Sequence, residues 1–131
     1  MRAALWPDAG IDALRAEAVA WDASQGIALL AFDDDGRAIG LAEASLRRDY
    51  VNGTESSPVG FLEAWFVQPD HRGRGVGRAL VAAVEDWTRG RGCRELASDA
   101  LLDNTGSHAA HAACGFEETE RVVYFRKRLA A

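Results

Sequence analysis

One short basic segment, rich in glycine, constrains this chain more than any other feature. It reads Arg72-Gly73-Arg74-Gly75-Val76-Gly77-Arg78 and contains three arginines, three glycines and no acid. Residues 59–67 before it are mostly apolar, as in a buried strand. The apolar residues after it recur at helical spacing: Val76, Leu80, Val84 and Trp87. We therefore predict a strand, a glycine-rich turn and a helix in direct succession.

This succession is typical of a phosphate site. Backbone N–H groups at a helix N-terminus carry partial positive charge, and glycines let a phosphate approach them closely. A pyrophosphate is the ligand that best suits such a segment. Gly73, Gly75 and Gly77 alternate as G-x-G-x-G, whereas the dinucleotide fingerprint requires G-x-G-x-x-G. The Walker loop is excluded because no Lys-Ser or Lys-Thr follows. A plain flexible turn at a helix start is the alternative.

The remaining pattern predicts a mixed α/β fold. In chain order we expect a helix over 11–23, strands over 27–32, 37–46 and 59–67, a helix from Val76 to the glycines at 90 and 92, a strand over 93–98, a helix over 104–114 and an extended segment over 116–127. A meander thus precedes crossover units. With 131 residues and no repeats or linker, we expect residues 1–131 to form a single domain.

Composition excludes several functions. The 15 basic and 20 acidic residues give a net charge of −5, which disfavours nonspecific nucleic-acid binding and favours cationic partners. No apolar run approaches the roughly 18 residues of a membrane helix, and no signal peptide is visible, so we expect a cytoplasmic protein without membrane contact. Cys93 and Cys114 are expected to be reduced, and no metal-ligand spacing appears.

Two blocks resemble one enzyme family. The pattern Arg72-x-x-Gly75-x-Gly77 resembles the acyl-CoA pyrophosphate loop of the GCN5-related N-acetyltransferases (GNAT). Asn104 stands 11 positions before Gly115-Phe116, which is the spacing of that family's Asn…Gly-Phe element. The resemblance implies a mixed central sheet with a splayed strand pair, flanked by helices. It also implies acetyl-CoA as co-substrate and no metal.

Further runs are similar to the aminoglycoside 6'-N-acetyltransferases. They are Asp49–Gly53, Ser56–Val59, Phe61–Glu63, Gly92–Glu95, Ala97–Asp99 and Gly115–Tyr124. This resemblance implies direct transfer of acetyl to the 6'-amino group of an aminoglycoside, which confers antibiotic resistance. Such enzymes begin with an edge strand before a Leu-Trp-Pro element; here Leu5–Pro7 stands near the start, so we expect that strand to be missing. They are commonly homodimers, and the apolar run Val122–Phe125 fits either a dimer contact or a buried strand.

The resemblance assigns cofactor contacts to three segments. Backbone groups of Trp65, Phe66 and Val67 are expected to pair with the pantetheine arm. Core packing is the alternative for Phe66 and Val67, and it is compatible with contacts made through the backbone. Asn104 is expected to bind or position that arm. The pyrophosphate contacts fall on the basic segment: Arg72, Gly73, Arg74, Gly75, Val76, Gly77 and Arg78.

The same resemblance assigns a cationic substrate to acidic and aromatic residues. Glu63 lies inside an apolar strand, so we expect a buried or half-buried carboxylate that is a general base (directly or through water), an ammonium anchor or a structural hydrogen-bonding group. Asp99 and Glu120 are further acidic contacts, with a turn cap and a solvated face as alternatives. Trp6 and Tyr50 are aromatic contacts, and Trp6 is alternatively a core anchor.

His111 stands seven positions after Asn104, where many relatives carry a tyrosine that is their general acid. Imidazole suits proton transfer near neutral pH. We expect His111 to protonate the leaving thiolate, with an ordinary helix histidine as the alternative. A thiol has a reference pKa of about 8.5, so this help is small.

Two other functions fit the same residues. The first is an acetyltransferase for another small cationic amine, because acidic residues favour any cation. The second is a truncated, non-catalytic acyl-CoA-binding module, which would bind acetyl-CoA without turnover.

Overall fold

The computed structural model describes residues 15–18 and 25–130. The chain divides into two compact units, Met1–Asp99 and Ala100–Ala131. Trp6 and most of the predicted helix over 11–23 lie outside the described residues.

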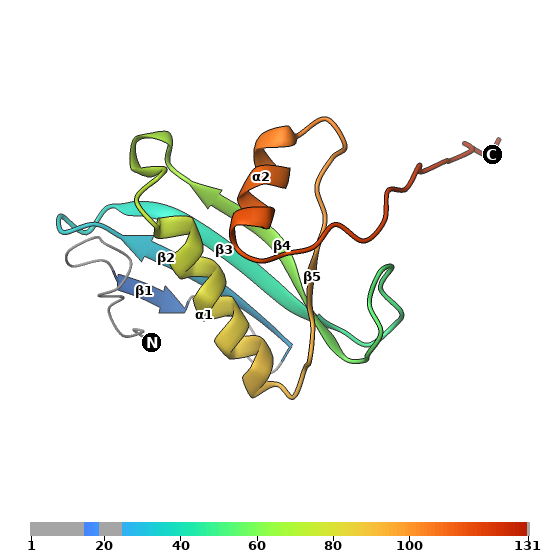
Figure 1. Cartoon of the computed structure of the whole chain (residues 1–131), viewed down its shortest axis with the longest axis horizontal. Coiled ribbons are helices and arrows are strands. Elements are labelled where there is room, and N and C mark those ends of the chain that lie inside the picture. Colours follow the sequence, from blue (N-terminus) through green and yellow to red (C-terminus); the bar gives the residue numbers. More distant parts are fainter. Residues whose placement is uncertain (1–14, 19–24, 131) are drawn as a thin grey trace. The chain divides into compact units, whose positions relative to one another are not determined.

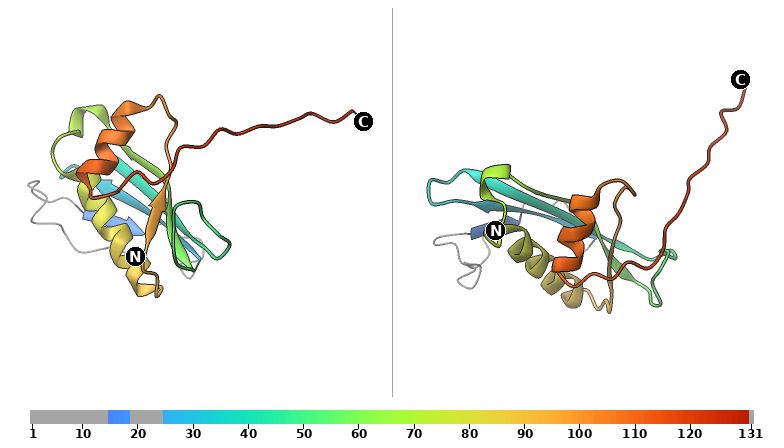
Figure 2. Two further views of the ribbon diagram at one scale, coloured as in Figure 1. Left: turned by 45° about the vertical axis from the view of Figure 1, so that its right-hand side comes forward. Right: turned by 45° about the horizontal axis from the view of Figure 1, so that its top comes forward.

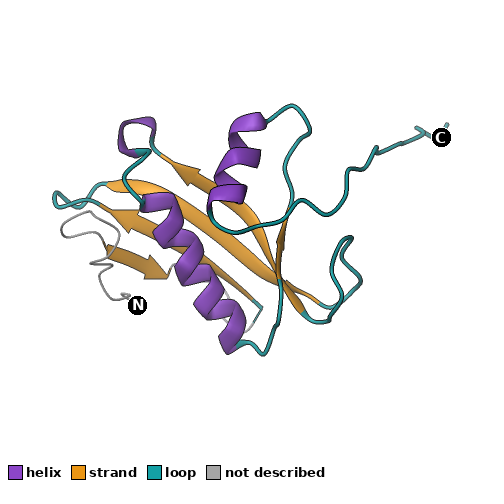
Figure 3. Ribbon diagram, viewed as in Figure 1, coloured by secondary structure: helices purple, strands orange, loops and turns teal. Residues whose placement is uncertain are grey.

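The first unit is built on a five-stranded sheet (Figures 1 and 3). Its strands are β1 (Arg15–Ala18), β2 (Gly26–Phe32), β3 (Ala38–Arg47), β4 (Val59–Val67) and β5 (Leu96–Ser98), in that spatial order. The first four pair antiparallel and β5 joins β4 in parallel. The mixed sheet expected from the sequence is therefore present, and the bounds predicted for β4 are confirmed.

The helix predicted over 11–23 is wrong at the four of its positions that the structure describes. Arg15–Ala18 form β1, which pairs with β2 from Arg15 opposite Phe32 to Ala18 opposite Leu29. Without this partner the outer edge of β2 would leave a row of backbone donors and acceptors unpaired. Ladder hydrogen bonds therefore outweigh the weak helical preference of an Ala- and Glu-containing stretch.

Helix α1 (Val76–Gly90) lies along one face of the sheet (Figure 2). Its apolar stripe of Val76, Leu80 and Val84 is almost fully buried. The sheet accepts the helix closely because β3 carries glycine at the crossing: a Cβ on Gly40 would lie 2.9 Å from Leu80 Cδ1. The core of this unit thus fixes the start of α1 against the start of β3 and the end of β4.

The strand predicted over 93–98 is shorter than expected. β5 begins only at Leu96, because the chain first completes the turn that ends α1. The Cys93 N–H donates to the Thr88 carbonyl over 3.2 Å, and the thiol is buried. Burial raises the pKa of the Cys93 thiol, with a smaller opposing effect of the Arg48 charge. Cys93 and Cys114 are both free thiols, as predicted.

The second unit contains α2 (Thr105–Ala113), close to the helix predicted over 104–114. The extended strand predicted over 116–127 is wrong: residues 116–130 form no strand. A strand requires a ladder partner, and this segment has none in the part of the chain that the structure describes. The side chains of Val123, Tyr124 and Phe125 are 77%, 83% and 92% exposed, so the buried-strand explanation of this apolar run also fails.

Within residues 15–18 and 25–130, no helix is long and apolar enough to cross a membrane. Over the same residues, no group of three or more His, Cys, Asp or Glu side chains is arranged to hold a metal ion.

Candidate active site

The strand β4 separates from its parallel neighbour half-way along its length. β4 and β5 pair from Gly60 opposite Leu96 to Leu62 opposite Ser98, where β5 ends. On its other edge β4 stays paired with β3 as far as Val67. The second half of β4 therefore borders β3 on one side and has no ladder partner among the described strands on the other. This is the splayed pair expected from the sequence.

A β-bulge marks the point of separation. Ala64 lies opposite Glu43 and Leu62 lies opposite Ala44, which leaves Glu63 as the extra residue of β4. Bulges bend a strand and redirect a side chain, and they are frequent beside active sites. Glu63 consequently projects from the sheet with 37% of its side chain exposed, more than its apolar neighbours in the sequence predict.

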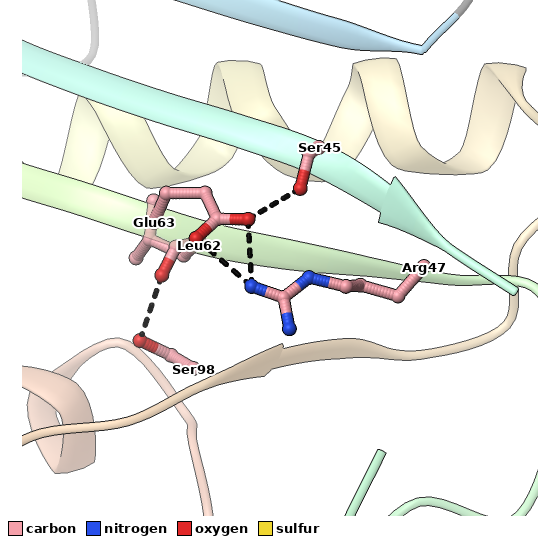
Figure 4. A network of polar contacts seen from close by, with 5 residues as sticks. All are labelled: Ser45, Arg47, Leu62, Glu63 and Ser98. Carbon is pink, nitrogen blue, oxygen red and sulfur yellow. Dashed lines mark hydrogen bonds and ion pairs between the residues drawn. The ribbon is translucent and has the colours of Figure 1, made fainter. Parts of the chain in front are cut away.

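The Glu63 carboxylate is held by two side chains of β3 (Figure 4). Arg47 Nη2 donates to Oε1 over 3.0 Å and to Oε2 over 2.9 Å. Ser45 Oγ donates to Oε2 over 2.5 Å. Partial burial raises the pKa of Glu63, but the hydrogen bonds from Ser45 and Arg47 and the charge of Arg47 outweigh it, so the pKa lies below the ordinary value. Glu63 is therefore an ionised hydrogen-bond acceptor and a weak base.

The first turn of α1 begins without a side-chain cap from any described residue. Gly75 is its N-cap residue, with a left-handed backbone at φ 86°. No acidic residue occurs in the first turn. The first N–H groups of a helix lack intrahelical partners and favour an anion. Arg72, Arg74 and Arg78 add positive charge at exposed positions. These features suit a pyrophosphate.

Two side chains fix this glycine-rich turn to the end of β4. Trp65 Nε1 donates to the Gly77 carbonyl over 3.2 Å, and a Cβ on Gly77 would lie 3.3 Å from the indole ring. Arg72 Nε donates to the Val67 carbonyl over 3.0 Å, and its guanidinium lies 5.6 Å from the Phe66 ring centroid. Trp65 and Arg72 therefore position the turn through their side chains. Phe66 is 46% exposed, so core packing does not explain it.

The Asn…Gly-Phe element is a helix with a cap at each end. Asn104 is the N-cap of α2, and its Oδ1 accepts from the Ser107 N–H over 3.1 Å. At the other end Gly115 has φ 90°, and the Phe116 N–H donates to the His111 carbonyl over 3.1 Å. The spacing of 11 residues thus follows from a nine-residue helix, and the cap leaves the Asn104 amide Nδ2 outside its own hydrogen bond.

His111 lies in the last turn of α2. Its Nδ1 lies 2.7 Å from the Ser107 carbonyl oxygen, which only accepts, so Nδ1 carries a proton. The ring meets Phe116 edge-on, with centroids 5.0 Å apart. In this tautomer the neutral ring therefore carries its proton on Nδ1, and Nε2 is an acceptor.

The other predicted substrate contacts are exposed. Tyr50 is 73% exposed in the loop between β3 and β4. Asp99 follows β5 and Glu120 follows α2, both exposed to solvent. Sequence reasoning missed Ser45 and Arg47. They alternate along β3 and so share one face, and the register that sets Ser45 opposite Phe61 puts Glu63, two residues further along β4, on that face.

Comparisons with known proteins agree with this geometry. The model of the acetyltransferase (GNAT) family matches residues 2–116. The chain belongs to the GNAT family. It is 60% identical over 129 residues to "Aminoglycoside N(6')-acetyltransferase type 1" of Stenotrophomonas maltophilia, covering 98% of this chain and 84% of that protein. The protein of the same name from Salmonella typhimurium is 50% identical over 128 residues, covering 98% of this chain and 88% of its own length.

Solved structures show the same fold. The aminoglycoside antibiotic 6'-N-acetyltransferase AAC(6')-Ih of Acinetobacter baumannii gives a TM-score of 0.77 at 53% identity, over 81% of this chain and 72% of that one. AAC(6')-Iy, solved with the bisubstrate analogue CoA-S-monomethyl-acetylneamine, gives 0.76 at 54% identity, over 80% and 71%. The splayed sheet and the glycine-rich turn before α1 therefore occur in an architecture shared with these enzymes.

Proposed function

We propose that this protein is an aminoglycoside 6'-N-acetyltransferase that uses acetyl-CoA and confers antibiotic resistance. The observation that carries this proposal is the combination of an exposed, ionised carboxylate on β4 and a basic helix start, without a side-chain cap, in the turn that follows β4. The helix start suits the pyrophosphate of acetyl-CoA, and the carboxylate suits a cationic acceptor. Relatives at 45% to 60% identity that bear the name of this activity support it.

The reaction is a direct acyl transfer. The nitrogen of the neutral 6'-amine attacks the thioester carbonyl carbon, a C–N bond forms, and the C–S bond breaks with its electron pair on sulfur. The amine proton leaves to solvent and the thiolate takes up a proton, which gives the N-acetyl aminoglycoside and free CoA. Because no covalent enzyme intermediate is needed, proximity of the two substrates supplies much of the acceleration.

Three segments of this chain would hold acetyl-CoA. The backbone of Gly73–Gly77 and the side chains of Arg74 and Arg78 would bind the pyrophosphate. Trp65, Phe66 and Val67 would align the pantetheine arm along the splayed edge of β4, with Arg72 holding the end of that strand. Asn104 would contribute its amide Nδ2, which is outside its own cap hydrogen bond.

We assign the acceptor to acidic and aromatic residues. Glu63 would accept a hydrogen bond from the 6'-amine rather than remove its proton, since its pKa is lowered. Asp99 and Glu120 would attract other ammonium groups, and Tyr50 and Trp6 would contact the sugar rings. His111 would return a proton to the thiolate from Nε2.

The organisation of the protein completes this proposal. The two compact units together would form one acetyltransferase domain, and the enzyme would act in the cytoplasm, where acetyl-CoA is made. A homodimer would cover the exposed apolar run Val122–Phe125. Light scattering coupled to size exclusion is the test: a single species near 14.1 kDa would contradict the dimer.

A matched pair of antibiotics tests the activity. Purified protein is mixed with acetyl-CoA and tobramycin, or with an analogue bearing a 6'-hydroxyl, and free thiol is followed with time. We expect turnover with the 6'-amine alone. Turnover with neither, together with acetyl-CoA binding by calorimetry, would favour the non-catalytic module. Turnover with polyamines only would favour an acetyltransferase for another cationic amine.

A further inference from the structure

The proposed reaction requires a neutral acceptor amine beside the Glu63 carboxylate at the bulge. An isolated carboxylate beside the acceptor would stabilise its ammonium form, which cannot attack a thioester. We propose that Arg47 is a positioning residue that cancels the charge of Glu63, so that the Arg47–Glu63 pair accepts a hydrogen bond from a neutral amine. This inference rests on the role proposed above for Glu63.

The geometry supports a permanent pair. Arg47 Nη2 contacts both carboxylate oxygens of Glu63, at 3.0 and 2.9 Å, and Ser45 Oγ donates to one of them. The Arg47 guanidinium also stacks over the Phe61 ring, with Cζ 4.1 Å from the ring centroid. The hydrogen bonds to Glu63 and the stacking on Phe61 pre-organise the guanidinium, so the side chain loses little conformational freedom when it forms the pair.

The pair also remains open to a substrate. The side chains of Arg47 and Glu63 are 43% and 37% exposed. A carboxylate offers about four lone-pair sites, of which three accept the hydrogen bonds from Ser45 and Arg47. One acceptor position is left for an incoming N–H group. The pairing of β4 with β5 ends at Leu62, so from Glu63 onward no described strand pairs with this edge of β4.

The charged side chains of β3, β4 and the end of β5 set the local charge around Glu63. β3 brings Arg47 and Glu43 to the face of Glu63, and Asp99 follows the end of β5. Arg47 is the basic side chain among these four charged groups, with Glu43, Glu63 and Asp99 acidic. Loss of Arg47 would therefore leave only acidic side chains among these four described groups. An opposite charge within about 4–6 Å raises the pKa of an amine by about 1 to 3 units. Because the side chains of Arg47 and Glu63 are partly exposed, we expect the rise in the pKa of the amine to lie at the lower end of this range.

The first experiment compares Arg47→Gln with Arg48→Gln. Arg48 is the adjacent arginine; it donates to Gln25 Oε1 over 2.9 Å and does not contact Glu63 among the described hydrogen bonds. With tobramycin and saturating acetyl-CoA, we expect Arg47→Gln to lower kcat about tenfold at pH 7, with an unchanged or lower KM for the antibiotic. The loss should shrink to within about threefold at pH 9, as the trapped ammonium gives up its proton to solvent. Arg48→Gln should resemble the wild type.

Two more variants separate charge from structure. Arg47→Lys keeps the charge and should retain kcat within about threefold of the wild type. The double variant Arg47→Gln/Glu63→Gln removes both charges, so the shift of the kcat profile toward high pH should disappear, whatever the remaining rate. Thermal unfolding of each variant checks that the fold is intact.

The outcomes are distinct. A kcat loss that is equal at pH 7 and pH 9, or a KM that rises with it, would overturn the charge-compensation role of Arg47. A pH shift that persists in the double variant would also overturn it, since no Glu63 carboxylate would remain. An inactive wild type would instead contradict the proposed function. A wild-type rate in Glu63→Gln alone would contradict the role of Glu63.

Discussion

Helices α1 and α2 begin in opposite ways. Helix α2 supplies its own cap, because Asn104 Oδ1 accepts from the Ser107 N–H. Helix α1 begins at Gly75 with no side-chain cap and with arginines on both sides. Capping is worth about 1 kcal/mol, so its absence at the longer helix is a cost to stability. On the proposal above, the first N–H donors of α1 are kept for a ligand, whereas one of the first donors of α2 is used by Asn104 of its own chain.

The largest predicted effect comes from giving α1 the cap that it lacks. Gly75→Asp places a carboxylate at a left-handed position that Asp tolerates. We expect acetyl-CoA affinity to fall about 100-fold, or about 2.8 kcal/mol, because the carboxylate takes the N–H donors and repels the pyrophosphate. Titration calorimetry measures this. Gly75→Asn is the matched uncharged control and should lose much less; equal losses would show that backbone strain, not charge, is responsible.

The next effect comes from removing the cap that α2 has. Asn104→Ala should lower the free energy of unfolding by about 1 kcal/mol, measured in urea. Asn104→Asp keeps the Oδ acceptor and should restore stability. If the amide Nδ2 also binds the pantetheine arm, acetyl-CoA affinity stays reduced in Asn104→Asp. Recovery of affinity together with stability would show that Asn104 only caps the helix.

The smallest effect concerns the far end of α2. His111→Gln should lower kcat by less than tenfold, because a thiolate needs little help to leave. The wild-type advantage should be largest at acidic pH, where imidazoles are protonated and Nε2 is a donor. His108→Gln is the matched control, since His108 Nε2 bonds only the Leu101 carbonyl among the described contacts. An advantage that grows with pH would contradict the general-acid role.

The sequence predicted those parts of the fold whose neighbours are local or strongly patterned. β4 and α1 were predictable because an apolar run, a glycine-rich turn and a 3.6-residue stripe follow one another. α2 was predictable because an Ala-rich run lies between Asn104, a residue type favoured at the N-cap, and Gly115. β1 was not, because Arg15–Ala18 has no strand pattern of its own and adopts that conformation through its pairing with β2.

The site was predictable in its residue types but not in its contacts. Glu63 stood out as a carboxylate in an apolar strand, yet its partners Ser45 and Arg47 were missed. Their meeting depends on the register between β3 and β4, in which Ser45 lies opposite Phe61, and no local sequence signal sets this register. The strand predicted for the apolar run Val122–Phe125 was wrong for a different reason. Its composition favours a strand, but a strand depends on a partner that local sequence does not specify.

The contrast between the two helix starts has one direct test. Adenosine diphosphate carries a pyrophosphate without a pantetheine arm, so it probes the first site alone. In a titration followed by amide NMR, we predict saturable shifts at Val76, Gly77 and Arg78 in the first turn of α1 and none at Thr105, Gly106 and Ser107 in the first turn of α2. Equal shifts at both helix starts, or shifts at neither, would contradict the assignment of the pyrophosphate to α1.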